Sequence, residues 1–305
     1  TSGSRALLPA EAPLVQLIVQ PFDAGKHRAV PLVGDARVTL EALAATLAGW
    51  RAPAAWEARA TALAAEWQGI VDRVTAPTNA LLPSDAQVLG AVNRCARPED
   101  AVVAAAGGLP GELHKLWRVS RPGGYHMEYG YSCMGYEIAG ALGARMARPD
   151  GEVLVLLGDG SYLMMNSEIA TSVMLGRKLV VVVLDNRGFG CIDRLQRACG
   201  GASFNNRLEH VDHVASPVPV DFAAHARALG AEAEHVAGIA DLEAALGRAR
   251  AASRTYVVVI ETDPTAATRE GGAWWDVAVP EVSARAEVVA ARESYERARA
   301  RQILA

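Results

Sequence analysis

Two short polar segments, each directly after an apolar run, hold the residues best suited to chemistry. Residues 158–161 read Gly-Asp-Gly-Ser, and residues 185–188 read Asp-Asn-Arg-Gly. Glycines let a backbone turn tightly and approach a ligand closely, and the free N–H groups at the start of a following helix attract anions. Asp159 can hold a cation against such an anion, and Asn186 offers an amide oxygen to the same cation.

These residue types favour magnesium bound to a diphosphate. Mg²⁺ takes about six oxygen ligands in near-octahedral geometry. One carboxylate, one amide oxygen, one backbone carbonyl and two phosphate oxygens leave a place for water. The single carboxylate, Asp159, suffices because the phosphates already carry negative charge. A magnesium phosphohydrolase is disfavoured, because it would need further clustered carboxylates and a nucleophile.

The elements around these segments indicate how they are positioned. From residue 84 onward, apolar strands alternate with helices, and an N-cap signal at Ser84 or Asp85 begins the first helix. The alternation is typical of the α/β class with a doubly wound, mostly parallel sheet. Ligands of such sheets bind at the carboxyl ends of strands. The expected helices are 85–96, 134–147, 167–176, 221–230 and 242–251, and the expected strands are 101–108, 152–160, 178–186, 231–237 and 255–263.

The region before residue 84 is organised differently. Short buried strands are expected at 14–20 and 29–35, followed by an amphipathic helix at 38–50. This is too little for a layered domain, so we interpret residues 1–50 as the C-terminal part of a domain whose front lies upstream. The further expectations are a helical linker over 51–83 with a helix at 54–74, a domain over 84–305, and a charged helix at 282–304 after the apolar pair Trp274 and Trp275.

Composition narrows the classes of function. The chain has 305 residues, 51% of them hydrophobic, and a formal net charge of −4, which gives no electrostatic case for nucleic acid. No run reaches the roughly 18 apolar residues of a membrane span. The four cysteines form no CxxC pair, which is typical of reduced thiols and favours a cytoplasmic location. The motifs of P-loop kinases and dinucleotide enzymes are absent.

The spacing of the two polar segments resembles a known cofactor signature. GDG at 158–160, then 25 residues, then Asn186, is similar to the thiamine diphosphate (ThDP) signature, GDG followed by a double Asn, with Asp185 in place of the first Asn. The resemblance implies that Mg²⁺ is held by Asp159, Asn186 and the carbonyl of Gly188. It implies that the cofactor contacts the residues Gly158, Gly160, Ser161 and Gly190.

An upstream segment, Ser132-Cys133-Met134-Gly135, resembles the family segment that shapes the cofactor. There a bulky apolar side chain props ThDP into a bent form, so that the cofactor deprotonates itself. The resemblance makes Met134 this wedge, a role that an unbranched, polarizable side chain can fill, and the carbonyl of Ser132 the acceptor for the cofactor's amino group. The alternative is that Met134 belongs to the ordinary core.

Several longer stretches of the chain carry a more specific resemblance. They are 22–36, 105–117, 123–143, 158–169, 185–192 and 274–283. Together these stretches look like the trihydroxycyclohexanedione hydrolases of inositol catabolism. That resemblance implies a ThDP- and Mg-dependent hydrolase that breaks a C–C bond of trihydroxycyclohexane-1,2-dione and opens the ring to 5-deoxyglucuronate. It places residues 1–50 in a Rossmann-like middle domain and residues from about 80 onward in the diphosphate-binding domain.

Proton transfer and binding of a polyhydroxylated ring call for polar side chains near the cofactor. We expect His114, His126 and Glu128, together with Tyr125, to lie in loops at the carboxyl edge of the sheet and to serve there as catalytic residues. His114 could instead be a helix-surface residue. Residues 200–206 (GGASFNN) could be a lid over the site or a simple turn.

Nothing in the chain matches the pyrimidine-binding domain that supplies the activating Glu in this family. The resemblance therefore implies a partner, either an upstream segment or another chain, and a homo-oligomer in which each site is shared. We expect residues 125–136 at that contact. The alternatives are an acetolactate-synthase-like carboligase or decarboxylase, and a non-catalytic diphosphate-binding module.

Overall fold

The computed structural model describes residues 8–9, 11–210, 220–271 and 276–302. The chain divides into two compact units. The first comprises residues 1–67, 198–201 and 272–305, and the second comprises residues 68–197 and 202–271. This division groups residues by proximity, so the domain boundaries expected at 50 and 83 stay a prediction. The pair Trp274 and Trp275 lies outside the described residues.

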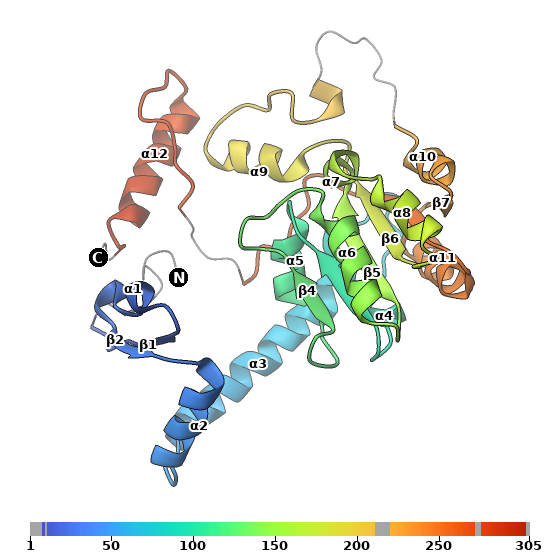
Figure 1. Ribbon diagram of the computed structural model, residues 1–305. Coiled ribbons are helices and arrows are strands. Elements are labelled where there is room, and N and C mark those ends of the chain that lie inside the picture. The colour runs from blue at the N-terminus through green and yellow to red at the C-terminus, as the bar shows by residue number, and fades with distance from the viewer. Residues whose placement is uncertain (1–7, 10, 211–219, 272–275, 303–305) are drawn as a thin grey trace. The chain divides into compact units, whose positions relative to one another are not determined.

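The second unit is built on a six-stranded sheet with the order β4-β3-β5-β6-β8-β7 (Figure 1). Every neighbouring pair in it is parallel. The central strands are buried on both faces, because apolar runs without alternation suit a sheet that is covered on both sides. The strands are β3 (Ala101–Ala104), β4 (Tyr125–Met127), β5 (Val153–Gly158), β6 (Val180–Asp185), β7 (Glu232–Val236) and β8 (Tyr256–Glu261).

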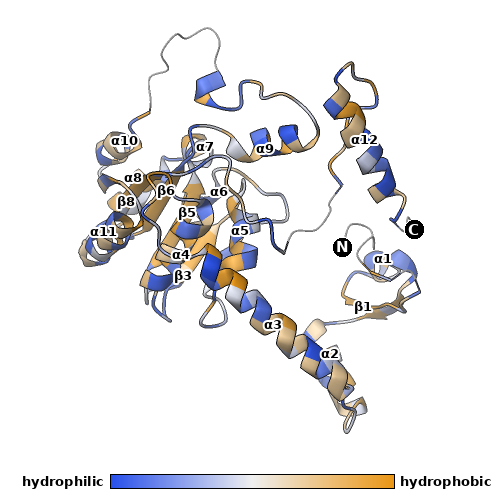
Figure 2. Cartoon of the chain, turned by 180° about the vertical axis from the view of Figure 1, so that it is seen from behind, coloured by the Kyte–Doolittle hydropathy of each residue, from blue (hydrophilic) through white to orange (hydrophobic). Residues whose placement is uncertain are grey.

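Helices cover both faces of this sheet, which confirms the doubly wound α/β prediction. The helices α4 (Asp85–Cys95), α5 (Leu109–Leu116) and α11 (Ile239–Ala251) pack on one face. The other face is covered by α6 (Tyr136–Ala147), α7 (Asp159–Met164), α8 (Glu168–Met174) and α10 (Phe222–Ala228). Figure 2 shows the strands of this sheet in mainly hydrophobic colours and the helices in mixed colours.

Local signals account for most of these elements. Ser84 is the N-cap of α4, and its capping box with Gln87 is complete. In the second unit, four helices and strands were not predicted: α5, α7, the edge strand β4, and α9 (Gly190–Ala198). The strand β4 has three residues and lies between glycine-rich segments, so its sequence carries no periodicity; its pairing with β3 defines it.

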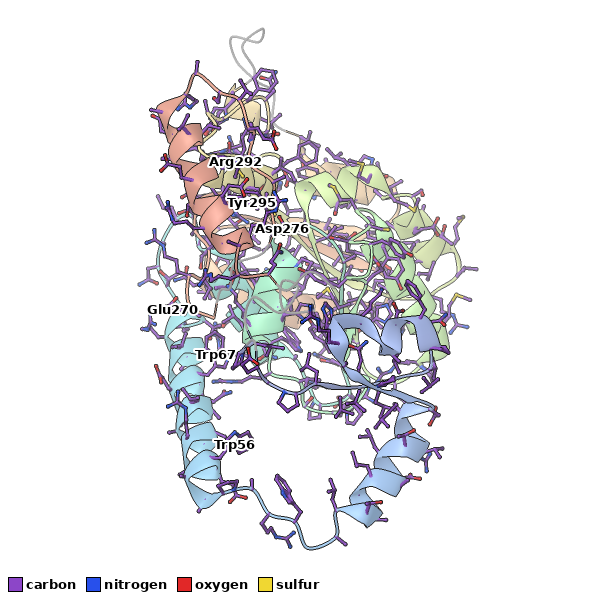
Figure 3. All side chains as sticks on the ribbon, turned by 90° about the vertical axis from the view of Figure 1, so that its left-hand side faces the viewer. Trp56, Trp67, Glu270, Asp276, Arg292 and Tyr295 are labelled. Atoms are coloured by element: carbon purple, nitrogen blue, oxygen red, sulfur yellow. The ribbon has the colours of Figure 1, made fainter. Side chains whose placement is uncertain are left out.

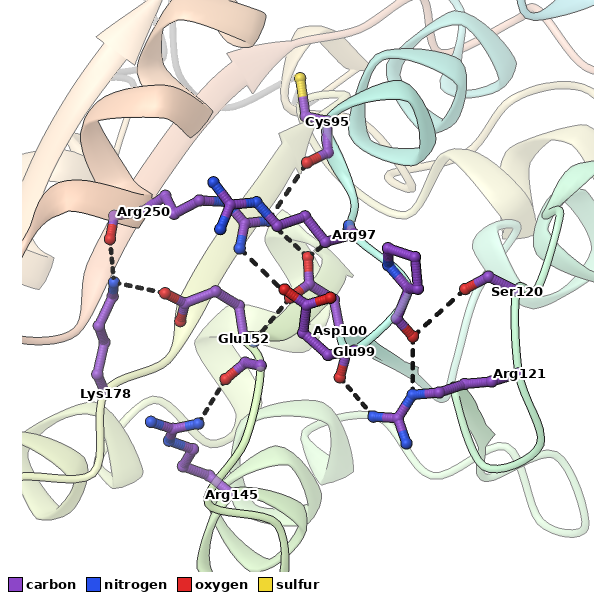
Figure 4. A network of polar contacts seen from close by, with 12 residues as sticks. Cys95, Arg97, Glu99, Asp100, Ser120, Arg121, Arg145, Glu152, Lys178 and Arg250 are labelled. Carbon is purple, nitrogen blue, oxygen red and sulfur yellow. Dashed lines mark hydrogen bonds and ion pairs between the residues drawn. The ribbon is translucent and has the colours of Figure 1, made fainter.

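The amino end of the sheet is closed by charged side chains (Figure 4). The carboxylate of Asp100 accepts hydrogen bonds from the backbone N–H of Glu152 and from the guanidinium of Arg250. Lys178 bridges the Glu152 carboxylate and the Arg250 carbonyl, at 2.8 Å each. These charged groups therefore bond to one another within the fold, although Glu152 Oε2 is buried without a hydrogen-bond partner among the described residues. The polar segments 158–161 and 185–188 lie at the opposite, carboxyl end of the sheet.

The first unit holds a two-stranded parallel sheet of β1 (Val15–Ile18) and β2 (Val30–Val33), so both expected strands are present. The expectation that they are buried is wrong in this structure, because every residue of the two strands is exposed or half-buried. Its helix α12 is braced by the hydroxyl of Tyr295, which donates to Asp276, and by Arg292, which donates to the Val279 carbonyl (Figure 3). Its helices are α1 (Pro21–Ala24), α2 (Ala36–Thr46), the first part of α3 (Ala54–Val74) and α12 (Ala286–Arg299); short 3₁₀ turns occur at Lys26–Arg28 here and at Leu208–His210 in the second unit.

Large apolar side chains in the first unit are exposed, among them Val15, Trp50 and Trp56. The expectation that residues 1–50 belong to a domain completed elsewhere is compatible with this exposure and stays a prediction. Among the described residues, no helix has the length and apolar character needed to cross a membrane.

Candidate active site

The topology of the second unit has a switch point at the carboxyl edge of its sheet, where a ligand-binding crevice is expected. The neighbouring strands β3 and β5 lead to opposite faces: β3 continues into α5, and β5 continues into α7 and α8. At such a switch point the loops diverge and leave room for a ligand. The residues at the two strand ends are 105–108 and 158–161, so the first polar segment found in the sequence borders this crevice.

Asp159 begins α7 at the edge of this crevice and is 5% exposed. Its Oδ2 accepts the backbone N–H of Gly188 at 2.7 Å. Its Oδ1 is buried and has no hydrogen-bond partner among the described residues. Burial and the nearby charge of Asp185 raise the pKa of Asp159 to about 7. A buried carboxylate oxygen without a partner is costly, and a bound cation would remove that cost.

The second polar segment turns back against Asp159. Arg187 has φ 62° and Gly188 has φ 139°, the latter a conformation open essentially only to glycine. A Cβ on Gly188 would lie 2.5 Å from the Asn206 carbonyl oxygen. The side-chain oxygen of Asn186 faces the N–H of Gly190 at 3.4 Å. The turn therefore places Gly188 against Asp159, with Asn186 two residues away in the same turn. The metal-ligand roles expected of the three residues stay a prediction.

Residues 202–206 support this turn. The backbone N–H of Phe189 donates to the Asn206 carbonyl at 2.7 Å, and the Ser203 hydroxyl donates to Asp193 of α9 at 2.6 Å. The larger segment 200–206 was left open as a lid or a turn. Its part within the second unit is tied by these hydrogen bonds to α9 and to the turn at 185–190.

Met134 lies beside Gly160 rather than in the core. A Cβ on Gly160 would lie 2.8 Å from the Phe189 ring and 3.3 Å from Met134 Cε. Met134 is 40% exposed, so the alternative of an ordinary core residue does not describe its environment. The place of Met134 fits the wedge role, which stays a prediction.

Ser161 is buried near Glu137, a fully buried carboxylate in the first turn of α6. The cofactor contact expected for Ser161 stays a prediction. Glu137 was missed at the sequence level. The signal available was a Glu within an otherwise apolar, small-residue helix.

The expectation that four polar residues lie in loops at the carboxyl edge is wrong for three of them. His114 is on α5, and Tyr125 and His126 are on β4. Only Glu128 follows the strand directly. Pairing decides this placement, because β4 forms a ladder with β3 and draws Tyr125 and His126 into the sheet. The reading of His114 as a helix residue was the better one.

Tyr125 and His126 are successive residues of β4, so their side chains point to opposite faces of the strand. His114 lies on the Tyr125 side, and His126 lies on the other side. On the α5 face, His114 Nδ1 is 2.9 Å from the Tyr125 hydroxyl. Burial raises the pKa of that phenol to about 12. On the α6 face, His126 Nε2 is 2.7 Å from the Tyr136 hydroxyl. His114 and His126 therefore do not form one proton relay.

His126 also lies before the carboxyl edge. It is opposite Val103, which is opposite Val155 of β5. Asp159 is four residues beyond Val155, roughly 13 Å further along at the ~3.3 Å rise of a parallel strand. The catalytic roles expected for His114 and His126 stay predictions, and this geometry does not support them.

The residues present fit a diphosphate with magnesium. Asp159 supplies a carboxylate oxygen without a partner, Asn186 supplies an amide oxygen, and Gly188 supplies a carbonyl in the same turn. These are hard oxygen donors of the kind that Mg²⁺ selects. Gly160 leaves backbone uncovered where a side chain would collide with Phe189. Asp185, also missed at the sequence level as a site residue, is buried beside Asp159 and accepts the N–H of Arg187.

Comparison with known proteins agrees with this geometry. Residues 105–261, 157 of the 305, match the family described as thiamine pyrophosphate enzyme, C-terminal TPP binding domain. A relative from Geobacillus thermodenitrificans, named 3D-(3,5/4)-trihydroxycyclohexane-1,2-dione hydrolase, is 35% identical over 95% of this chain and 50% of its own length. A protein of the same name from Bacillus cereus is 41% identical over 68% of this chain and 33% of its own.

Solved structures share the fold. The Rhodococcus jostii RHA1 thiamine diphosphate-dependent 4-hydroxybenzoylformate decarboxylase aligns with a TM-score of 0.54 and 20% identity, over 61% of this chain and 34% of that one. Benzoylformate decarboxylase from Polynucleobacter necessarius aligns over the same shares with a TM-score of 0.51. The chain spans half or less of the length of these relatives and structures. It belongs to the thiamine pyrophosphate enzymes and carries their C-terminal TPP-binding domain.

Proposed function

We propose that this chain supplies the diphosphate- and magnesium-binding half of a ThDP-dependent hydrolase. The reaction is hydrolytic cleavage of a C–C bond in trihydroxycyclohexane-1,2-dione, which opens the ring to 5-deoxyglucuronate in myo-inositol catabolism. The buried, unpartnered Oδ1 of Asp159 beside the Gly188 turn carries the cofactor part of the proposal. The names of the relatives support the substrate part.

The residues divide the work by position. Asp159, Asn186 and the Gly188 carbonyl would hold Mg²⁺, and the backbone at Gly158, Gly160, Ser161 and Gly190 would border the diphosphate. Met134 would set the shape of the site, and the Ser132 carbonyl would accept a hydrogen bond from the cofactor. Thiamine diphosphate, when bound, supplies a nucleophilic carbon and takes up the electron pair of the breaking C–C bond.

We further propose that the site is completed by a pyrimidine-binding domain from an upstream segment or another copy. Exposed apolar side chains of the second unit support this, because such side chains mark interfaces when they gather. They include Tyr129, Tyr131, Met134, Leu163, Met164 and Met165. A homo-oligomer with residues 125–136 at the contact would bury them. The four free cysteines favour a cytoplasmic location.

The test uses the complete enzyme with ThDP and Mg²⁺. We expect consumption of trihydroxycyclohexane-1,2-dione with release of one acid per ring, and loss of this activity in Asp159→Ala. Pyruvate is the second substrate offered. Carboligation or decarboxylation of pyruvate without turnover of the dione would favour the acetolactate-synthase-like alternative, whereas ThDP binding without either reaction would favour a non-catalytic module.

A further inference from the structure

The segment from Tyr131 to Gly135, between β4 and α6, carries the residues expected to shape the cofactor but has no regular structure of its own. Two of its residues have left-handed backbone, Ser132 with φ 52° and Gly135 with φ 92°. For Ser132 this backbone conformation is unfavourable. Such conformations persist only where surrounding contacts stabilise them enough to offset their cost. The contacts that do so here come from two carboxylates.

Glu128 holds the first part of segment 131–135. Its Oε1 accepts the backbone N–H of Tyr131 at 3.0 Å, and its Oε2 accepts the backbone N–H of Cys133 at 2.8 Å. These hydrogen bonds from Cys133 and Tyr131 hold the pKa of Glu128 below its usual range. Both carboxylate oxygens are thus engaged by the loop, and a depressed pKa makes Glu128 a poor proton donor.

Glu137 holds the last part of the segment. Its Oε2 accepts the backbone N–H of Gly135 at 3.0 Å, and its Oε1 accepts the backbone N–H of Ala106 at 3.1 Å. Ala106 follows β3, so this fully buried carboxylate joins the segment to the other side of the crevice. Burial raises the pKa of Glu137.

We propose that Glu128 and Glu137 are positioning residues that form a carboxylate clamp on segment 131–135, fixing the Ser132 carbonyl and the Met134 side chain for the cofactor. Three alternate N–H groups, those of Tyr131, Cys133 and Gly135, donate to the clamp. The inference rests on the proposed function, and it reassigns Glu128 from catalysis to positioning.

Glutamate suits both positions of the clamp because each side chain faces two backbone N–H donors and has two oxygens to accept them. A glutamine at either position would offer one oxygen to two backbone N–H groups and would place its own N–H against the second. Because the clamped segment brings Met134 Cε beside Gly160, a loosened clamp displaces the wedge while leaving Asp159 and Asn186 in place. The clamp therefore affects the part of the cofactor beyond the diphosphate.

The first experiment measures backbone hydrogen–deuterium exchange across residues 128–137 in the complete enzyme without cofactor. We expect Glu128→Ala to accelerate exchange at Tyr131 and Cys133 by about tenfold or more, and Glu128→Gln to do so less. Asp221→Ala is the control, because Asp221 likewise accepts a backbone N–H, that of Ala224 at the start of α10. Unchanged exchange at 131 and 133 in Glu128→Ala would refute the clamp.

The second experiment compares two ligands by calorimetry, ThDP and inorganic pyrophosphate, each with Mg²⁺. We expect Glu128→Ala to lower the affinity for ThDP about tenfold, as displaced positioning groups commonly do, while the affinity for pyrophosphate stays within about twofold. Equal losses for both ligands would contradict the clamp. Glu128→Gln that abolishes turnover with unchanged exchange and ThDP affinity would make Glu128 catalytic instead.

The buried Glu137 provides a second variant. Glu137→Gln should accelerate exchange at Gly135 and Ala106 together; exchange that rises at neither residue would remove Glu137 from the clamp. If the parent enzyme binds no ThDP, the proposed function fails, but the exchange experiment on the cofactor-free protein still decides whether the clamp exists.

Discussion

Asp159 is buried close to a second carboxylate, Asp185, and this proximity has an energetic consequence. A carboxyl whose pKa rises from 3.8 to about 7 binds its proton more tightly in the folded than in the unfolded protein. The stability it contributes is present below about pH 4 and is lost as the pH rises through about 7. Without metal, ionised Asp159 therefore destabilises the fold near neutral pH, and a bound cation offsets that effect.

The substitution Asp159→Asn tests this directly. Asn keeps an acceptor for the Gly188 N–H but cannot ionise. Above pH 7 we expect the cofactor-free variant to be more stable than the parent, with the difference vanishing toward pH 4, and Mg²⁺ with pyrophosphate to stabilise only the parent. Thermal unfolding between pH 4 and 8, with exposed Asp241→Asn as control, measures both. Parallel pH profiles for parent and variant would show that Asp159 ionises normally.

The substitution Met134→Ala tests whether the site shapes the bound cofactor, separately from how it binds the charged diphosphate. Since Met134 contributes an apolar side chain beside Gly160, its truncation should leave the affinity for pyrophosphate with Mg²⁺ unchanged. We expect proton–deuterium exchange at C2 of bound ThDP to slow about tenfold or more, because the site no longer enforces the reactive form. Exchange as fast as in the parent would remove Met134 from the role of wedge.

At the scale of elements, the turn 185–190 between β6 and α9 determines whether the metal ligands meet. Its geometry depends on Gly188, whose φ of 139° and contact with the Asn206 carbonyl exclude a side chain. The turn is thus held from outside by the neighbouring segment 202–207, which bridges to Gly188 through Arg207. A change at this one position should reach both Asn186 and Asp159.

Gly188→Ala should therefore displace the turn. We expect the thermal midpoint to fall and the affinity for Mg²⁺ with pyrophosphate to drop about tenfold or more, since misplaced ligands bind a metal poorly. Gly176→Ala is the matched control: Gly176 also has positive φ, 60°, but no atom lies within 4 Å of its added Cβ. The prediction fails if both variants retain the parent's magnesium affinity.

At the scale of the whole molecule, the second unit exposes apolar side chains around the crevice, among them Tyr131 at 91%. In the proposed function, the residue that activates the cofactor's pyrimidine ring comes from a pyrimidine-binding domain in an upstream segment or another copy. We expect the 305-residue chain alone to be catalytically silent toward the dione, and expect activity to return when the pyrimidine-binding part is supplied. Turnover by the pure chain would overturn the half-site proposal.

The sequence alone determined the α/β class and the alternating order of the main strands and helices. It also placed Asp159 and Asn186 after neighbouring strands; their role as metal ligands, with Gly188, stays a prediction. The order and this placement follow from local patterns, because parallel strands bring their carboxyl ends to one edge, so residues spaced one strand–helix unit apart meet there. The resemblance of GDG and Asn186 to the ThDP signature then predicted thiamine diphosphate as the cofactor. The match to the TPP-binding domain family confirmed that prediction.

Only the tertiary structure determined the positions and contacts of residues 125–137, which precede that signature in the chain. The pairing of β4 with β3 took Tyr125 and His126 out of a loop and placed them on opposite faces of a strand. The partners of Glu128 and Glu137 are backbone N–H groups, which every non-proline residue carries, so no residue type in the sequence marks them. Their roles depend on the path of the backbone through Ser132 and Gly135, which only the folded chain defines.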